Sequence, residues 1–132
     1  RGFKCLLPLK ATLKDLSADL VVKYPNGGPV SLSTAHGKQY LPDLTDERVR
    51  AWWSARYAEL LRAGLSGVWQ AERAPNLPDS AQYACEGAAL SHVAAHNLYI
   101  ACAASAAHAA MRAAQPAKRP HVLARLSQGG LQ

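Results

Sequence analysis

Three short, largely apolar stretches lie far apart along the chain, and each has the length of a buried β-strand. They are residues 2–9 (GFKCLLPL), 67–69 (GVW) and 121–126 (HVLARL). Short apolar runs bounded by glycine, proline or polar residues are typical of strands covered on both faces, as in parallel sheets. The hydrophobic pattern therefore predicts three strands.

Between the first two strands, apolar positions recur every three or four residues and predict an amphipathic helix. Its apolar stripe consists of Val49, Trp52, Trp53, Tyr57, Leu60 and Leu61. Thr45 can cap the first turn, because its hydroxyl can accept a hydrogen bond from a backbone N–H, and Gly64 supplies a left-handed stop. A second helix is predicted over residues 86–114, where alanine, the best helix former, predominates.

The other segments are richer in turn-forming residues. Residues 24–40 carry the turn sequence PNGGP and a further glycine at position 37, so we expect an irregular excursion with a small hairpin. Residues 10–20 (KATLKDLSADL) mix polar and apolar side chains in a way that is compatible with a short helix.

Strand, helix, short loop and strand is the order of a βαβ unit in a parallel sheet. The pattern therefore predicts an α/β fold with about three parallel strands, two long helices and an irregular excursion. A closed (β/α)8 TIM barrel needs about 250 residues, so this chain would supply roughly half of one. We expect residues 1–132 to form one partial-barrel domain, fragment-like, whose open edges need the rest of a parent chain or a protein partner.

Composition narrows the classes of function. The sequence is 49% hydrophobic and 18% charged, which is a globular composition. Its net charge of +6 comes from scattered Lys and Arg residues, which does not favour nucleic-acid binding. No apolar run reaches the roughly 20 residues of a membrane span. Three cysteines without CxxC spacing, Cys5, Cys85 and Cys102, indicate reduced and mostly buried thiols.

Four stretches together resemble glycoside hydrolase family 31, the family of α-glucosidases and α-xylosidases. Residues 40–70 contain a Pro-Asp segment, a helix with a Trp-Trp pair, a glycine and the strand GVWQ, in the family's order. Residues 95–101 (AHNLYIA) are similar to its His-Asn-Leu-Tyr-Gly segment, and residues 119–130 (RPHVLARLSQGG) to its Arg-Pro-Phe-Val-Leu-x-Arg-Ser strand. Residues 1–9 fit the strand that carries Gly-Phe-Lys and a later proline.

The resemblance implies a (β/α)8 barrel that hydrolyses α-linked glycosides with retention, by means of two carboxylates and no cofactor. The family's catalytic strand reads roughly Gly-x-Trp-x-Asp-Met-Asn-Glu-Pro, and its Asp is the nucleophile. Gly67, Trp69 and Pro75 match this pattern, but Ala71 stands at the nucleophile position. Glu72 is a weak substitute, because the next residue of a strand faces the other way. The resemblance places the general acid in a segment outside these residues.

Two positions match residues that contact the sugar in the family. Trp69 matches a tryptophan of the sugar pocket, and Arg125 matches the arginine of the Val-Leu-x-Arg strand. An indole face against a pyranose and a guanidinium donating to hydroxyls are physically sound contacts. Two structural alternatives stay open: a tryptophan packed in the core, and an arginine paired with a carboxylate.

The histidines and cysteines suggest no separate chemistry. His92 and His96 share one helical face, as paired zinc ligands do, but no third ligand stands nearby in the sequence, so no metal site is predicted. No Cys-His spacing favours a nucleophilic pair.

We therefore expect a barrel segment similar to glycoside hydrolase family 31 that is catalytically inactive by itself. One alternative is that it belongs to an active O-glycosyl hydrolase acting on α-glucosides or α-xylosides. Another is a non-catalytic module that binds carbohydrate or serves as a scaffold.

Overall fold

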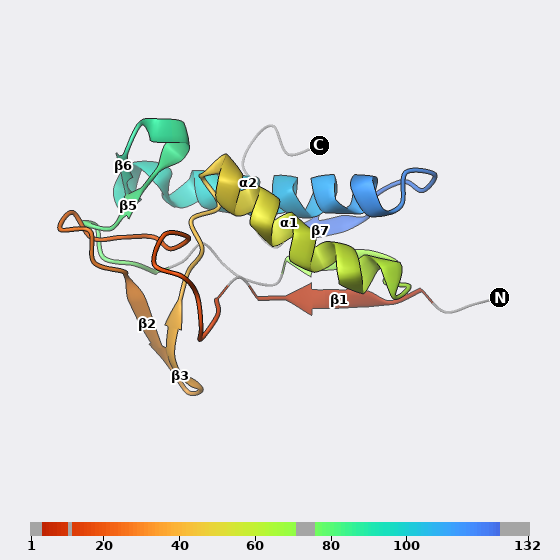
Figure 1. Cartoon of the computed structure of the whole chain (residues 1–132), viewed down its shortest axis with the longest axis horizontal. Coiled ribbons are helices and arrows are strands. Elements are labelled where there is room, and N and C mark those ends of the chain that lie inside the picture. The colour runs from red at the N-terminus through yellow and green to blue at the C-terminus, as the bar shows by residue number, and fades with distance from the viewer. Residues whose placement is uncertain (1–3, 11, 71–75, 125–132) are drawn as a thin grey trace.

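The computed structural model describes residues 4–10, 12–70 and 76–124, and three parallel strands form its central sheet. They are β1 (Leu6–Leu9), β4 (Gly67–Gln70) and β7 (Val122–Ala124), in the order β1-β4-β7. Both neighbouring pairs are parallel, and Figure 1 shows the chain crossing from one strand to the next through a long helix. The predicted α/β architecture with three parallel strands is confirmed.

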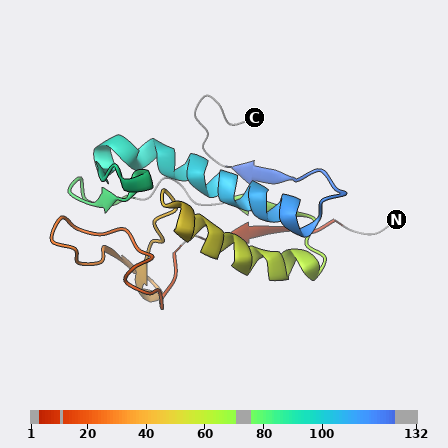
Figure 2. The ribbon, with the colours of Figure 1, turned by 45° about the horizontal axis from the view of Figure 1, so that its top comes forward.

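Two long helices, α1 (Glu47–Arg62) and α2 (His92–Ala114), lie side by side over the sheet (Figure 2). Small side chains on α2 allow the close approach: Ala103 and Ala107 are fully buried, and the Ser54 hydroxyl of α1 donates to the carbonyl of Ala106 at 3.1 Å. One hydrophobic core joins these helices to Val68 of β4. Burial of alanine on α2 therefore sets the spacing between the two helices.

The first helix follows the prediction closely, with two differences. Its N-cap is Asp46 and not Thr45, because the Asp46 carboxylate accepts the Arg48 N–H at 2.8 Å. The buried stripe is narrower than predicted, since Leu60 is exposed. Gly64, just past the end of the helix, has a φ of +108° and confirms the predicted left-handed stop.

The second helix begins at His92, six residues later than the predicted start. The preceding segment consists of β5 (Gln82–Tyr83), a short 3₁₀ turn, η1 (Cys85–Gly87), and β6 (Leu90–Ser91), which pairs antiparallel with β5. The backbone of this segment turns left-handed at Cys85, Glu86, Gly87 and Ala89. A helix cannot pass through a run of positive φ values, so the alanine-rich pattern is overridden here.

The predicted excursion contains the predicted hairpin, formed by β2 (Ser31–Thr34) and β3 (Gly37–Tyr40). The short helix expected within residues 10–20 is wrong: the described residues there form turns and bends. Leu13 exchanges two backbone hydrogen bonds with Tyr40, at 3.0 and 2.8 Å, and this pairing requires extended backbone. Among the described residues, no helix is long and apolar enough to cross a membrane.

Candidate functional site

The candidate site lies where the three parallel strands end. The register pairs Leu9 of β1 with Gln70 of β4, and Gln70 with Ala124 of β7. The carboxyl ends of the strands therefore meet at one edge, which is where α/β folds place their ligands. Figure 1 shows that β2 and β3, which follow β1 in the sequence, and β5 and β6, which follow β4, all lie beyond the tip of β1.

Of the predicted site residues, the structure places Trp69. The residue is 41% exposed and lies on the sheet face opposite Val68, which packs into the core beneath the helices. Leu6 and Leu123 are also exposed apolar side chains on the strands flanking β4, and Leu123 pairs directly with Trp69. Trp69 therefore lies outside the hydrophobic core beneath the helices, and the role assigned to it from the sequence stays a prediction.

The other predicted site residues lie outside the described residues. Ala71 and Glu72 follow β4 directly, and Arg125 follows β7 directly. Since Gln70 and Ala124 are register partners, the chain enters positions 71 and 125 from neighbouring points on the strand-end edge. The roles assigned to these three residues from the sequence stay predictions.

Gln70 is a buried polar residue that the sequence analysis did not single out. Its side chain has no exposed surface, and neither its amide nitrogen nor its amide oxygen has a hydrogen-bond partner in the described part of the structure. Leaving such a group unpaired in the interior costs about 1–3 kcal/mol. The signal in the sequence was a lone amide closing an otherwise apolar strand, one residue before position 71.

We expect Gln70→Met to stabilise the protein by about 1 kcal/mol, because an apolar side chain of similar length removes the unpaired amide from the interior. Urea unfolding followed by circular dichroism measures the change. The matched control is Gln82→Met at an exposed strand position, where we expect little effect. A loss of stability in Gln70→Met would show that the amide has a partner.

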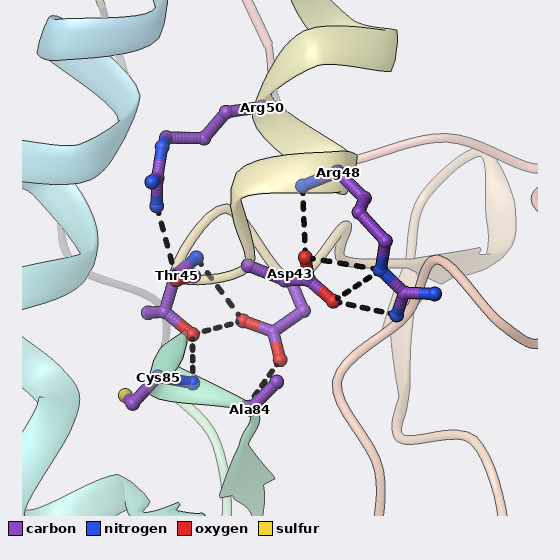
Figure 3. Close-up of polar contacts among 7 residues, drawn as sticks. Asp43, Thr45, Arg48, Arg50, Ala84 and Cys85 are labelled. Atoms are coloured by element: carbon purple, nitrogen blue, oxygen red, sulfur yellow. Dashed lines mark hydrogen bonds and ion pairs between the residues drawn. The ribbon is translucent and has the colours of Figure 1, made fainter. Parts of the chain in front are cut away.

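A buried acidic residue joins the loops that follow β1 and β4, as Figure 3 shows. One oxygen of Asp43 accepts the Thr45 N–H at 3.1 Å and the Thr45 hydroxyl at 2.5 Å. Its other oxygen accepts the Ala84 N–H at 2.7 Å, and the Thr45 hydroxyl accepts the Cys85 N–H at 3.0 Å. We call Asp43, Thr45, Ala84 and Cys85 the loop junction.

Burial raises the pKa of the Asp43 carboxyl, because removal from water outweighs the hydrogen bonds that favour its charged form. Beside the junction, Arg50 donates to the Thr45 carbonyl at 3.0 Å and to the Glu86 carboxylate at 2.5 Å. These contacts join the start of α1 to the 3₁₀ turn 36 residues later in the sequence. The loop junction therefore holds the segment before α1 against the segment that follows β5.

The paired histidines of α2, His92 and His96, make contacts with each other and with a neighbouring tyrosine. His92 is buried, and its Nδ1 lies 3.0 Å from the Tyr83 hydroxyl. The His96 ring packs edge-on against His92, with centroids 5.0 Å apart. Burial raises the pKa of the Tyr83 phenol. No cluster of three or more His, Cys, Asp or Glu suited to a metal ion occurs among the described residues.

The cysteines differ in part from expectation. Cys5 is exposed, and Cys85 and Cys102 are half-buried, so the prediction of mostly buried thiols is wrong. All three are free thiols. Burial raises the pKa of Cys102, which disfavours the reactive thiolate.

The fold and the shared strand-end edge define a segment of a (β/α)8 barrel. Residues 9–132 match the family described as "Glycosyl hydrolases family 31 TIM-barrel domain", and the chain belongs to this family. It is 26% identical over 121 residues to "Alpha-glucosidase 2" of Bacillus thermoamyloliquefaciens, covering 86% of this chain and 15% of that protein. The predicted family resemblance is confirmed.

Solved structures agree on the fold. An endoplasmic-reticulum glucosidase II heterodimeric complex superposes with a TM-score of 0.78 at 18% identity, over 94% of this chain and 16% of that one. The family 31 α-glucosidase of Bacteroides thetaiotaomicron gives 0.73 at 24% identity, over 96% and 22%. This chain therefore spans a small part of the length of these relatives.

Proposed function

We propose that this family 31 barrel segment is catalytically silent, because it lacks the nucleophile of glycoside hydrolysis. The observation that carries the proposal is Ala71, which follows β4 directly at the position where the family resemblance has its aspartate. A retaining glycosidase needs a carboxylate there to attack the anomeric carbon, and a methyl group cannot do so.

Glu72 is a poor replacement on physical grounds. It is displaced by one residue, and a shift of about 1 Å in a reacting group can lower a rate about a hundredfold. The proposal rests on the sequence at positions 71 and 72 and on the strand that leads into them.

The test is hydrolysis of p-nitrophenyl α-glucoside and α-xyloside by the full natural protein. We expect no turnover above the rate without protein. Turnover that Glu72→Gln abolishes would reject the proposal, since Glu72 would then be the nucleophile. Matched controls are Glu47→Gln and Glu59→Gln, two acidic positions on α1, which leave turnover unchanged in either case.

A second candidate is an active O-glycosyl hydrolase for α-glucosides or α-xylosides, with its attacking carboxylate elsewhere in the protein. The similarity to an α-glucosidase and to solved family 31 glucosidases favours it. A 5-fluoroglucosyl fluoride, which traps the covalent intermediate of retaining α-glucosidases, would label the attacking residue. Mass spectrometry of the labelled peptide distinguishes the two candidates.

We also propose that the strand-end edge keeps a contact with sugar through Trp69 and Arg125. The exposed indole of Trp69 supports this contact, since it offers an aromatic face at the end of β4. Calorimetric titration with maltose measures it. Arg125→Ala is expected to remove the heat of binding, and a natural protein that releases no heat at millimolar maltose would reject it.

The exposed apolar face of the sheet supports a further part of the proposal. Leu6, Trp69 and Leu123 are each 41–50% exposed on β1, β4 and β7. In a closed barrel this face is the packed interior. We propose that further strands of the same barrel cover it, or else a protein partner.

A further inference from the structure

A surface depression at the foot of the β2–β3 hairpin is separate from the strand-end site. It has a volume of about 570 Å³, which falls within the usual range for small-molecule sites. One wall is the segment that follows β1, and the other is the base of the hairpin. Its lining residues are Lys14, Asp15, Leu16, Ser17, Ala18, Pro29 and Tyr40.

Backbone pairing holds the two walls together. Tyr40, the last residue of β3, exchanges two hydrogen bonds with Leu13, and Leu13 packs against the core. Val30, which follows the lining residue Pro29, donates to the Val22 carbonyl at 2.9 Å. The depression is therefore built on paired backbone on both sides.

The side chains of the depression are suited to a neutral ligand rich in hydroxyl groups. Lys14 offers an ammonium donor and Asp15 a carboxylate acceptor, and within the described residues neither has an ion-pair partner. Adjacent opposite charges cancel at a distance, so they give no preference for an anion or a cation. At close range they can donate to and accept from hydroxyl groups at once.

The half-buried ring of Tyr40 adds an aromatic surface. The Lys38 ammonium lies 5.7 Å from its ring centroid. A pyranose has an apolar face and a rim of hydroxyl groups. The Tyr40 ring can pack against that face, and the polar side chains beside it can bond the hydroxyl groups. Ser17 adds a hydroxyl group to the lining. This hydroxyl already donates a hydrogen bond to the Asp19 carboxylate.

From these observations we infer that the depression is a second carbohydrate-binding site, for a neutral α-glucan oligosaccharide. The inference rests on the proposed sugar contact for the choice of α-glucan. Lys14 follows Leu9, the register partner of Gln70, by five residues, so the two sites are joined by at most about 18 Å of extended chain.

The experiment is calorimetric titration of the full natural protein with maltotriose, with hydrogen–deuterium exchange in parallel. We expect Tyr40→Ala to weaken binding about fivefold, as loss of an aromatic contact does. Tyr40→Phe, which keeps the ring, is expected to bind like the natural protein. Lys14→Met and Asp15→Asn, both at exposed positions, test the polar contacts without threatening folding.

Exchange localises the ligand, since maltotriose is expected to slow amide exchange in residues 12–18. Unchanged exchange there, or Tyr40→Ala binding as tightly as Tyr40→Phe, would overturn the inference. Preferred binding of glucuronate over glucose would also overturn it, because the site would then select an anion.

Trp69→Ala separates this site from the strand-end contact. If Trp69→Ala weakens binding and the changes at Tyr40, Lys14 and Asp15 do not, the second site is rejected and the strand-end contact stands. If only the changes in the depression weaken binding, the second site stands and the strand-end contact fails. If no variant changes binding, both are rejected.

Discussion

Replacing Asp43 with asparagine is expected to destabilise the protein by about 2–3 kcal/mol, a large effect for a change of one atom. Both carboxylate oxygens accept hydrogen bonds: one from the N–H and hydroxyl of Thr45, the other from the N–H of Ala84. Asparagine has one acceptor and one donor group at these places. Either orientation of the amide therefore points an NH₂ group at a backbone N–H.

Urea unfolding measures the loss, and amide exchange shows where it acts. We expect faster exchange at Ala84 and Cys85 in Asp43→Asn, since their N–H groups are held by the loop junction. Asp46→Asn is the matched control, because asparagine caps helices as well as aspartate does. It loses only an exposed ion pair with Arg48, worth about 0–1 kcal/mol. Equal losses in the two variants would contradict the role of the junction.

The loop junction also explains where prediction from the sequence failed. Asp43 lies 41 residues before Ala84, and Thr45 lies 40 residues before Cys85. Hydrogen bonds at such separations leave no periodic signal. The Asp-x-Thr spacing was a local sign of a turn, because aspartate side chains often bond the backbone two residues later. Its link to a second loop became visible only in three dimensions.

The same contacts account for two of the errors in the helices, the N-cap of α1 and the start of α2. The Thr45 hydroxyl is engaged by Asp43 and Cys85, so the cap passes to Asp46. Holding the N–H groups of Ala84 and Cys85 also fixes the start of the left-handed segment that delays α2. Alanine content predicts helix from local propensity alone, and tertiary contacts override propensity.

The central sheet was predictable because its signals are local and strong. Short apolar runs separated by helices permit few arrangements, and parallel pairing with right-handed crossovers is the common one. Of the residues predicted for the candidate site, only Trp69 lies within the described residues, near the end of β4 where the strand pattern positions it, and its role stays a prediction. Gln70 was missed, since hydropathy does not reveal whether a buried amide finds a partner.

Gly67→Ala is expected to destabilise the protein by about 1–3 kcal/mol, because the new methyl group has no room. A Cβ atom at this position would lie 2.6 Å from a terminal carbon of Leu6 and 2.7 Å from the His121 carbonyl oxygen. Leu6 is exposed and can rotate away. The His121 carbonyl belongs to the backbone and accepts the Val68 N–H at 3.0 Å, so β4 and β7 would have to separate.

The clash must outweigh an opposing effect in the unfolded chain. Replacing glycine by alanine restricts the unfolded state and by itself stabilises a protein by about 0.4–1 kcal/mol. Gly28→Ala is the matched control: its new Cβ would meet only the side chain of Asn26, at 3.2 Å, which can shift. We expect Gly28→Ala to stay close to the natural protein in urea unfolding, and Gly67→Ala to unfold at clearly lower urea. If Gly67→Ala is as stable as Gly28→Ala, β4 and β7 do not approach each other as closely at Gly67 as the sheet requires.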